Sequence, residues 1–175
     1  REKKFRPLES EYSGSERQSR KSQIVNCKLK IIDDYAHHPE EIKATLAALK
    51  EKYPDYKIIA FFQPHTFSRT KTLLKEFGGC FKKADFVYLL PTFASAREQK
   101  PKENIDELLL KEVGKYHRNA KSLPFNFKSL SSEINELLNS KFRIPNKFKI
   151  PNSKFIILSM GAGDVYKLTE KLDLI

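Results

Sequence analysis

The sequence predicts an α/β fold: a Rossmann-like three-layer sandwich in which helices cover both faces of a mainly parallel sheet. Short apolar runs alternate along the chain with segments of helical periodicity. The run at 57–62 is apolar at almost every position, as expected of a strand covered on both faces. Polar segments follow these apolar runs directly, at the place where parallel sheets bind their ligands.

Strands and helices are expected in alternation. The strands are predicted at 28–33, 57–62, 86–90 and 155–159, with a weaker one near 119–123. Pro39 suits the first turn of the first helix. The apolar stripes of the helices are Ile42, Leu46 and Leu49; Leu73, Leu74, Phe77 and Phe81; Ile105, Leu108, Leu109 and Val113; and Leu130, Ile134, Leu137 and Leu138. A final helix is expected at 164–172.

The length of 175 residues fits one domain of ordinary size. Residues 1–22 are polar and charged, and we interpret them as a linker or edge segment whose partner is missing. The domain itself is expected at 23–175. Within it, residues 141–152 form a short Lys- and Pro-containing tandem repeat, which indicates an exposed loop insertion; a basic binding loop is the alternative.

Composition narrows the possible functions. No apolar run approaches the roughly 20 residues that a membrane span needs. The polar N-terminal residues show no signal peptide, and Cys27 and Cys80 lack metal-type spacing, so reduced thiols in a cytoplasm are expected. The net charge is +11, but basic and aromatic residues do not interleave in one compact stretch, which argues against nucleic-acid binding as the main function.

The segment after the first strand, 33–39, combines two acids, an aromatic residue and two histidines. The carboxylate of Asp34 offers acceptors for ribose hydroxyls, and Tyr35 offers a ring for stacking. The alternative is that Asp34 and the histidines cap the helix that starts at Pro39. A metal shared by His37 and His38 is not expected, because adjacent side chains point in different directions.

The later strands are also followed by polar segments. In 63–70, His65 and Arg69 lie four residues apart, so both face one ligand if a helix begins near Thr66; a capping turn with a solvated Arg69 is the alternative. The segment 91–98 says little by itself. In 160–164, a Gly-x-Gly pattern precedes Asp164, which favours a tight turn lining a pocket over a phosphate cradle.

Taken in order, the segments 33–39, 63–70, 94–98 and 160–164 resemble the C-terminal domain of the Mur ligase family. The resemblance runs from about residue 12 to 175. It is closest for the branch that joins L-alanine to UDP-N-acetylmuramate in bacterial peptidoglycan synthesis. Enzymes of this branch use ATP and Mg²⁺, and they form an acyl phosphate that the amine of L-alanine attacks.

The resemblance also implies roles for individual residues. Asp34 matches the acid that holds the ATP ribose, Tyr35 the residue beside the adenine, and Arg17 an arginine that reaches the ATP phosphates. Three further residues match those around the incoming L-alanine, with the arginine pairing its carboxylate: His37, His65 and Arg69. The chain departs from many relatives in having Gln18 after Arg17, and Thr66 where many have a second arginine.

In such ligases the C-terminal domain closes over ATP beside an N-terminal domain for the uridine nucleotide and a central domain with the phosphate-binding loop. No G-x-x-x-x-G-K-[ST] segment and no cluster of acids for Mg²⁺ is visible in the 175 residues. We therefore assign no catalytic residue or metal ligand to this chain, expect the central domain to bind most of the magnesium, and expect no ligase or ATPase activity from the chain alone.

Three alternatives remain on sequence grounds. The first is the related murein peptide recycling ligase. The second is a metallohydrolase that uses Asp34 together with His37, His38 and His65. The third is a non-catalytic basic domain that binds nucleic acid.

Overall fold

A five-stranded, all-parallel sheet forms the centre of the fold, as the alternating pattern predicts. The computed structural model describes residues 28–95, 98–139 and 154–167. The expected linker at 1–22, with Arg17 and Gln18, and the expected insertion at 141–152 lie outside the described residues, as does the later part of the helix expected at 164–172. The strands, in the spatial order β1-β5-β2-β3-β4, are β1 (Lys28–Asp34), β5 (Lys154–Met160), β2 (Lys57–Phe62), β3 (Phe86–Leu89) and β4 (Ala120–Ser122).

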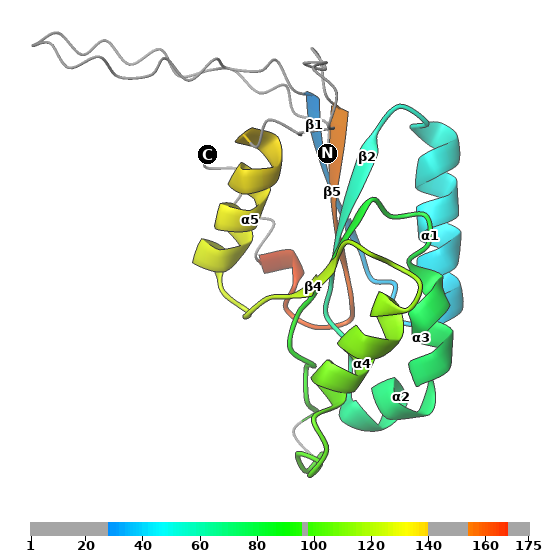
Figure 1. Ribbon diagram of the computed structural model, residues 1–175, viewed down its shortest axis with the longest axis vertical. Helices are drawn as coiled ribbons and strands as arrows, with labels where there is room; N and C mark the ends of the chain where they lie inside the picture. Colours follow the sequence, from blue (N-terminus) through cyan, green and yellow to red (C-terminus); the bar gives the residue numbers. More distant parts are fainter. Residues whose placement is uncertain (1–27, 96–97, 140–153, 168–175) are drawn as a thin grey trace, which may run out of the picture.

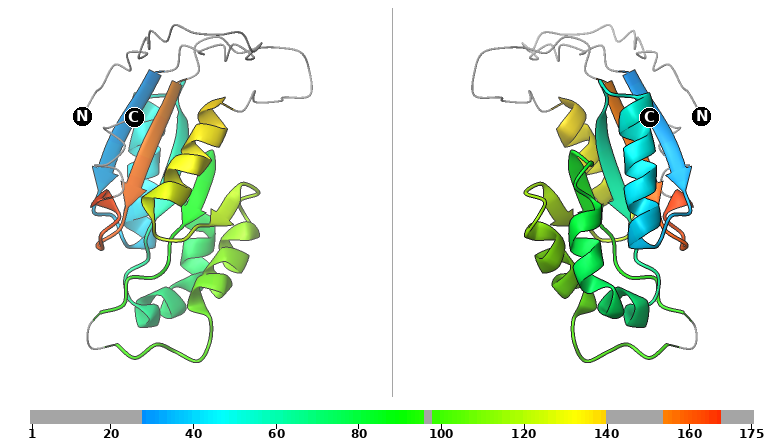
Figure 2. Two further views of the ribbon diagram at one scale, coloured as in Figure 1. Left: turned by 90° about the vertical axis from the view of Figure 1, so that its left-hand side faces the viewer. Right: turned by 90° about the vertical axis from the view of Figure 1, so that its right-hand side faces the viewer.

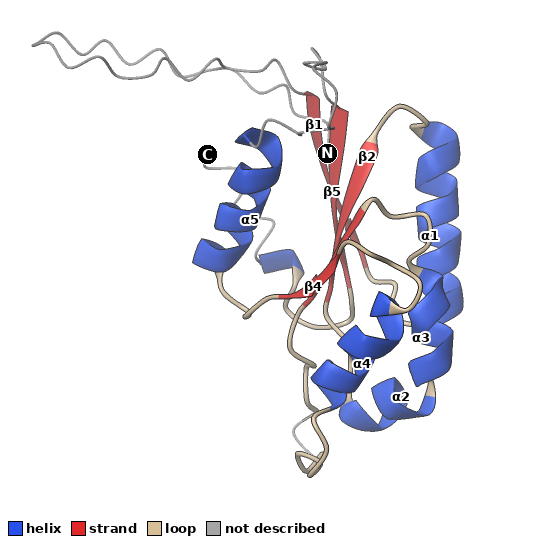
Figure 3. Cartoon of the chain, viewed as in Figure 1, coloured by secondary structure: helices blue, strands red, loops and turns tan. Residues whose placement is uncertain are grey.

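Helices cover both faces of this sheet, which confirms the three-layer prediction. They are α1 (Pro39–Lys52), α2 (Phe67–Thr72), α3 (Leu74–Cys80), α4 (Ile105–Gly114) and α5 (Phe127–Asn139). Figure 1 shows α1, α3 and α4 on one side of the strands and α5 on the other. The two side views in Figure 2 and the colouring of Figure 3 show the same layers, with the strands between the helices.

The pleat of β2 explains why the core has two halves. Ile58, Ala60 and Phe62 are fully buried in the cluster that includes the α1 residue Leu46. The alternate residues of the strand point to the opposite face, because successive side chains of a strand alternate. Ile59 and Phe61 are likewise fully buried, in the cluster that includes Leu130 and Ile134 of α5. A strand buried on both sides requires the continuous apolar run seen in the sequence.

The structure confirms one expected helical stripe and corrects one residue of another. The stripe from Leu73 to Phe81 predicted one helix, which is α3, with Leu73 as its N-cap and Phe81 as its C-cap. The short helix α2 precedes it. Leu108 was expected on the buried stripe of α4, yet it is 36% exposed. The buried row of α4 runs instead through Ile105, Leu109 and Val113, one residue every four, and Leu108 lies beside it.

The order of the strands creates a crevice beside β1. The chain leaves β1 for α1 on one face of the sheet, whereas after β5 it turns to the other face, where Val165 packs with the α5 cluster. Since β1 and β5 are neighbouring strands, the connections that follow them diverge to opposite faces of the sheet at the carboxyl ends of these two strands. Ligands of open α/β sheets bind at such a switch point.

Candidate functional site

The polar segments predicted after the strands meet at one edge of the sheet. Backbone bonds link them across neighbouring strands: Gly161 N donates to Asp34 O at 3.3 Å, and Gln63 N donates to Met160 O at 3.0 Å. On the next strand along, Phe93 N donates to Pro64 O at 2.8 Å. Segments that are up to about 130 residues apart in the chain therefore form one continuous surface, as the carboxyl ends of parallel strands should.

A cavity of about 440 Å³ lies at the switch point between β1 and β5. Its walls come from the segments after β1, β3 and β5, and the lining residues are Asp33, Asp34, Tyr35, Phe93, Ser159, Gly161, Ala162, Gly163, Asp164, Val165 and Tyr166. We call it the switch-point pocket. The expectation that the Gly-x-Gly turn lines a pocket is thus confirmed.

Asp34 is fixed in this pocket by two donors. Ala36 N donates to Oδ1 at 2.9 Å, and the Thr45 hydroxyl donates to Oδ2 at 2.7 Å. The neighbouring Asp33 accepts a short hydrogen bond from the Ser159 hydroxyl of β5. Each carboxylate oxygen can accept more than one bond, so these contacts orient Asp34 and still leave it capacity for a ligand hydroxyl.

Aromatic side chains gather at the mouth of the switch-point pocket. Six large hydrophobic side chains are exposed among the described residues, and three of them line this pocket: Tyr35 at 70%, Tyr166 at 43% and Phe93 at 37%. Exposed aromatic faces beside carboxylates suit a flat, hydroxyl-bearing ligand such as a nucleoside. The sequence pointed to Tyr35 alone, because the other two lie in segments with weak local signals.

The turn after β5 packs closely at both of its glycines, and Gly161 is the more constrained of the two. Gly161 has a φ of +139°, and a Cβ there would lie 2.5 Å from the backbone oxygen of Gln63. A Cβ on Gly163 would lie 2.5 Å from the Gln63 side-chain oxygen. Asp164, expected at the helix N-cap, pairs with Lys167 at 2.7 Å, and the first described helical residue is Tyr166. Acids at this rim disfavour a phosphate.

The two histidines after β1 have different tasks. His38 is the N-cap of α1, and with Glu41 it completes a capping box. The helix-capping alternative therefore holds for His38. The backbone N–H groups of His37 and His38 both donate to the Glu41 carboxylate, which lowers the pKa of Glu41 below its ordinary value. The His37 ring lies between Tyr35, at a centroid distance of 5.4 Å, and His65, at 6.2 Å.

His65 stands beside a strained residue. Thr66 has a φ of +66°, a region that β-branched residues rarely adopt. Bonds on both sides hold it there: Thr66 N donates to Phe93 O at 2.9 Å, and the Thr70 hydroxyl donates to Thr66 O at 2.8 Å. Helix α2 begins directly afterwards at Phe67, so the predicted helix start near Thr66 is confirmed.

Unsatisfied buried polar atoms are concentrated in the same segment. Among the described residues, four buried side-chain atoms have no hydrogen-bond partner, and three of them lie between residues 63 and 69: Gln63 Oε1, His65 Nδ1 and an Arg69 Nη. Each such atom costs about 1–3 kcal/mol. A fold tolerates that cost chiefly at sites where a ligand or another domain supplies the missing partner.

The charge on His65 is disfavoured by its surroundings. Burial lowers the pKa of His65 below its ordinary value, and the Arg69 and His37 charges lower it further, while Glu98 opposes them. A neutral imidazole therefore stands beside a permanent guanidinium at neutral pH. This pair can donate to a carboxylate while only one of its members carries a charge.

Glu98 is a residue that the sequence motifs left without a role. Its carboxylate accepts from Phe67 N and Ser68 N, both at 2.8 Å, and so caps the first turn of α2 from 30 residues away in the chain. Burial by itself raises the pKa of Glu98, but these bonds outweigh it and leave the pKa below its ordinary value. Capping by a distant segment has no local sequence signal.

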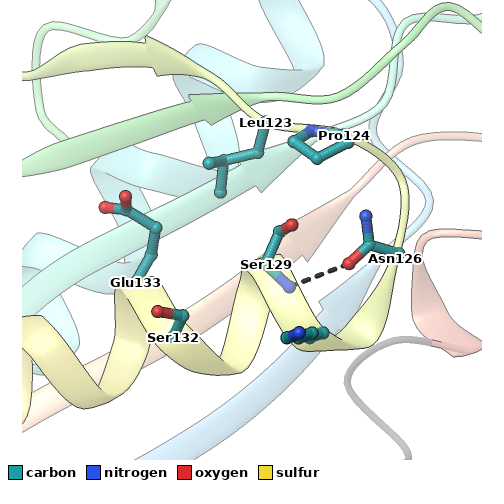
Figure 4. Close-up of a pocket in the computed structure, with 7 residues that line it drawn as sticks. Leu123, Pro124, Asn126, Ser129, Ser132 and Glu133 are labelled. Atoms are coloured by element: carbon teal, nitrogen blue, oxygen red, sulfur yellow. Dashed lines mark hydrogen bonds between the residues drawn. The ribbon is translucent and has the colours of Figure 1, made fainter.

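A second hollow, of about 650 Å³, lies against α5 at the other side of the sheet. Figure 4 shows its lining: Leu123 and Pro124 before the helix, and Ser129, Ser132 and Glu133 on it. Some of the polar groups there already have partners, since Ser129 N donates to Asn126 Oδ1 at 2.8 Å and the Tyr88 hydroxyl donates to Glu133 at 2.9 Å. It is larger than the switch-point pocket, but no predicted site residue lines it.

Two further findings concern a metal site and a membrane span. No group of three His, Cys, Asp or Glu side chains that could hold a metal ion occurs in residues 28–95, 98–139 and 154–167. In the same part of the chain, no helix combines the length and the apolar character needed to cross a bilayer.

Comparison with known proteins identifies the domain. Residues 19–131 match the model of the Mur ligase family described as "Mur ligase, glutamate ligase domain". A UDP-N-acetylmuramate–L-alanine ligase of Lactiplantibacillus plantarum is 53% identical over 89 residues, which are 51% of this chain and 20% of that protein. The ligase of the same name from Desulforapulum autotrophicum is 38% identical over 146 residues, 81% of this chain and 28% of that protein. The chain thus spans less than a third of the length of these relatives.

Solved structures show the same fold. The UDP-N-acetylmuramate–alanine ligase of Thermotoga maritima matches with a TM-score of 0.54 at 20% identity, over 85% of this chain and 26% of that one. The murein peptide ligase of Psychrobacter arcticus matches with the same TM-score at 18% identity, over 85% of this chain and 27% of that one. These two likenesses concern the fold and do not separate the two activities. The family match and the motif-bearing edge lead to one assignment: the chain belongs to the Mur ligase family, as its C-terminal domain, and resembles that domain of the L-alanine ligases.

Proposed function

We propose that this chain is the C-terminal domain of a UDP-N-acetylmuramate–L-alanine ligase, which closes over ATP and positions L-alanine for amide bond formation with UDP-N-acetylmuramate. The observation that carries the proposal is the adjacency of two kinds of surface on one sheet edge. A pocket with carboxylates and aromatic rings lies beside the segment 63–69, which carries the Arg69 cation and three buried polar atoms without partners. One surface suits a nucleoside and the other an amino-acid carboxylate.

On the nucleoside side, Asp34 accepts hydrogen bonds from the ribose hydroxyls and Tyr35 lies against the adenine. The two donors that fix the Asp34 carboxylate support this role, because they reduce the entropy lost when a hydroxyl binds. Asp33 and Asp164 line the same pocket and add negative charge, which turns the ATP phosphates away from it. Arg17, which lies outside the described residues, is proposed to reach those phosphates.

On the amino-acid side, Arg69 pairs with the carboxylate of L-alanine, and His65 and His37 flank it. The unpartnered Arg69 nitrogen and His65 Nδ1 support this role. A guanidinium offers two parallel donors to a carboxylate, which fixes the orientation of the amino acid. The amine is then held for attack on the carbonyl carbon of the acyl phosphate. As the amide forms, the bond between that carbon and the phosphate oxygen breaks, and inorganic phosphate leaves.

Magnesium ions and the phosphate-binding loop are assigned to the central domain of the intact enzyme. The described part of this chain offers no cluster of acids that fits such an ion, so no step of the mechanism uses a metal held here. The partners of the chain are accordingly its own N-terminal and central domains, and its place of action is the bacterial cytoplasm, where ATP is available.

Ligand binding to the 175-residue chain tests the nucleoside half of the proposal directly. Titration with adenosine, followed by NMR, is expected to shift the resonances of Asp34, Tyr35 and Gly161. Shifts confined to the hollow against α5, or no shifts at all, contradict the proposal.

The amino-acid half is tested in the complete enzyme that contains this domain. With purified protein, ATP, Mg²⁺ and UDP-N-acetylmuramate, L-alanine is expected to be the preferred amine donor over a free murein tripeptide. Preference for the tripeptide identifies a recycling ligase instead. Retained preference for L-alanine in Arg69→Met contradicts the assigned role of Arg69.

A further inference from the structure

Phe93 contacts both functional surfaces, although no motif assigns it a role. Its ring lies parallel to the His65 imidazole, with ring centroids 5.8 Å apart and an interplanar angle of 12°. The same side chain lines the switch-point pocket and is 37% exposed there. It also packs closely on the turn after β5, since a Cβ on Gly163 would lie 3.1 Å from the Phe93 Cβ.

The backbone of Phe93 fixes this arrangement. Phe93 N donates to Pro64 O, Thr66 N donates to Phe93 O, and the two segments form a parallel bridge between His65 and Phe93. The positive φ of Thr66 is thus held partly by Phe93 itself. These bonds hold the Phe93 backbone beside that of His65, which places the two rings against each other.

We propose that Phe93 is a positioning residue, which holds the His65 imidazole in place and transmits occupancy of the switch-point pocket to it. Only the second half rests on the proposed function, because it needs a nucleoside in the pocket; the first half concerns the free chain. A flat ligand between Tyr35 and Phe93 contacts the exposed part of the Phe93 ring. A tilt of that ring displaces the stacked imidazole and its charged neighbours Arg69 and Glu98. Such a coupling is reciprocal: L-alanine bound beside His65 would change the affinity of the switch-point pocket for a nucleoside by the same factor.

The free chain tests the first half. The chain contains four histidines, so the His65 ring signals are assigned by single His→Gln variants and followed by NMR from pH 8 to pH 4. In Phe93→Ala, water reaches the imidazole and the pKa of His65 is expected to rise. Phe93→Tyr keeps the stacked ring and is expected to retain the wild-type pKa. Phe125→Ala is the matched control, because Phe125 is also 37% exposed but lies near the hollow against α5.

A His65 titration that is the same in Phe93→Ala and in wild type overturns the positioning role, as does an equal rise in Phe125→Ala. Thermal unfolding of each variant is measured in parallel. A pKa rise accompanied by general loss of structure also counts against a local role.

Addition of adenosine tests the second half. In the wild-type chain, the ligand is expected to shift the resonances of Tyr35 and of the His65 ring together. In Phe93→Ala the Tyr35 shift is expected to persist while the His65 shift is lost. A Tyr35 shift without any His65 shift in wild type overturns the transmission but leaves the nucleoside site intact. Absence of both shifts refutes the nucleoside site and the transmission together, and the free-chain titration still decides the positioning role.

Discussion

The two edges of the sheet treat their charged side chains in different ways. At the amino edge, the Asp85 carboxylate accepts from Lys50 Nζ at 2.7 Å, from Lys57 Nζ at 2.9 Å and from Ile58 N at 2.9 Å. At the carboxyl edge, Arg69 keeps a buried nitrogen without a partner. An unpartnered imidazole nitrogen occurs at both edges, in His65 and in His117, so the difference concerns the charged groups.

Lysines at the amino edge also have internal partners: Lys154 pairs with Asp55 at 3.1 Å, and Lys30 lies over the Tyr53 ring at 4.9 Å. Exposed pairs of this kind are individually weak. Among the described residues, Arg69 is the cation whose buried nitrogen has no partner.

The largest expected effect comes from the carboxyl edge. Gly161→Ala forces a side chain into a backbone conformation with φ of +139° and against the oxygen of Gln63. We expect the free energy of unfolding to fall by about 3 kcal/mol, measured by urea denaturation. Gly114→Ala at the end of α4 is the control, because a Cβ there meets nothing within 4 Å. Equal losses in both variants would show that the turn after β5 is not specially constrained.

The next effect belongs to the amino edge. Asp85→Asn removes the charge shared by Lys50 and Lys57, and the free energy of unfolding is expected to fall by about 2 kcal/mol. Burial by itself raises the pKa of Asp85, but the bonds from Lys50, Ile58 N and Lys57 outweigh it and leave the pKa below its ordinary value. The stabilisation is therefore present above about pH 4 and is lost as the pH falls through the lowered pKa.

This pH dependence is checked by measuring the urea midpoints of wild type and Asp85→Asn between pH 7 and pH 2.5. The midpoints of the two proteins should converge at the acidic end. Asp55→Asn is the control, because the Asp55 side chain is 73% exposed and its pair with Lys154 should contribute less than about 1 kcal/mol. A difference between wild type and Asp85→Asn that persists unchanged at pH 2.5 speaks against the ion pairs.

A smaller effect is expected for Asp34→Asn. The amide keeps one oxygen for Ala36 N and can still pair with the Thr45 hydroxyl, so the fold should be preserved. The affinity for adenosine is expected to fall by about tenfold, or about 1.4 kcal/mol, as measured by titration calorimetry. Asp164→Asn, at the rim of the same pocket, should reduce the affinity for adenosine less. A larger loss of affinity in Asp164→Asn than in Asp34→Asn would assign ribose recognition to the rim.

Arg69→Met is expected to change stability least, and not to lower it as Gly161→Ala and Asp85→Asn do. Methionine keeps the apolar stem but removes a partly buried guanidinium that has one buried nitrogen without a partner, so the free energy of unfolding should stay constant or rise by up to about 1 kcal/mol. The pKa of His65 should rise with the loss of the nearby charge. Lys71→Met on the same helix is the control, because Lys71 is exposed and pairs with Glu103. A clear loss of stability in Arg69→Met alone would mean that Arg69 holds the fold.

The sequence predicts the layers of this fold and the edge that carries the site, because apolar periodicity and strand ends are local signals. It also predicts which side chains stand at that edge. It does not predict that Leu73 divides α2 from α3, or that Glu98 caps α2 across 30 residues, because both depend on packing between segments distant in sequence. Phe93 was missed for the same reason: its significance arises from its pairing with His65. The ligand roles of Asp34, Tyr35, His37, His65 and Arg69 stay predictions.

The pairing of β1 with β5 has a kinetic consequence. Asp33 and Ser159, which bond across these strands, are 126 residues apart, so the first described strand finds its partner in the last one. Contacts of such long range form slowly, and during synthesis they must wait until the final strand has left the ribosome. The strands β2, β3 and β4 can associate earlier, since they follow one another in the chain. The switch-point pocket between β1 and β5 is therefore completed last, and a nascent domain gains it only when its folding is finished.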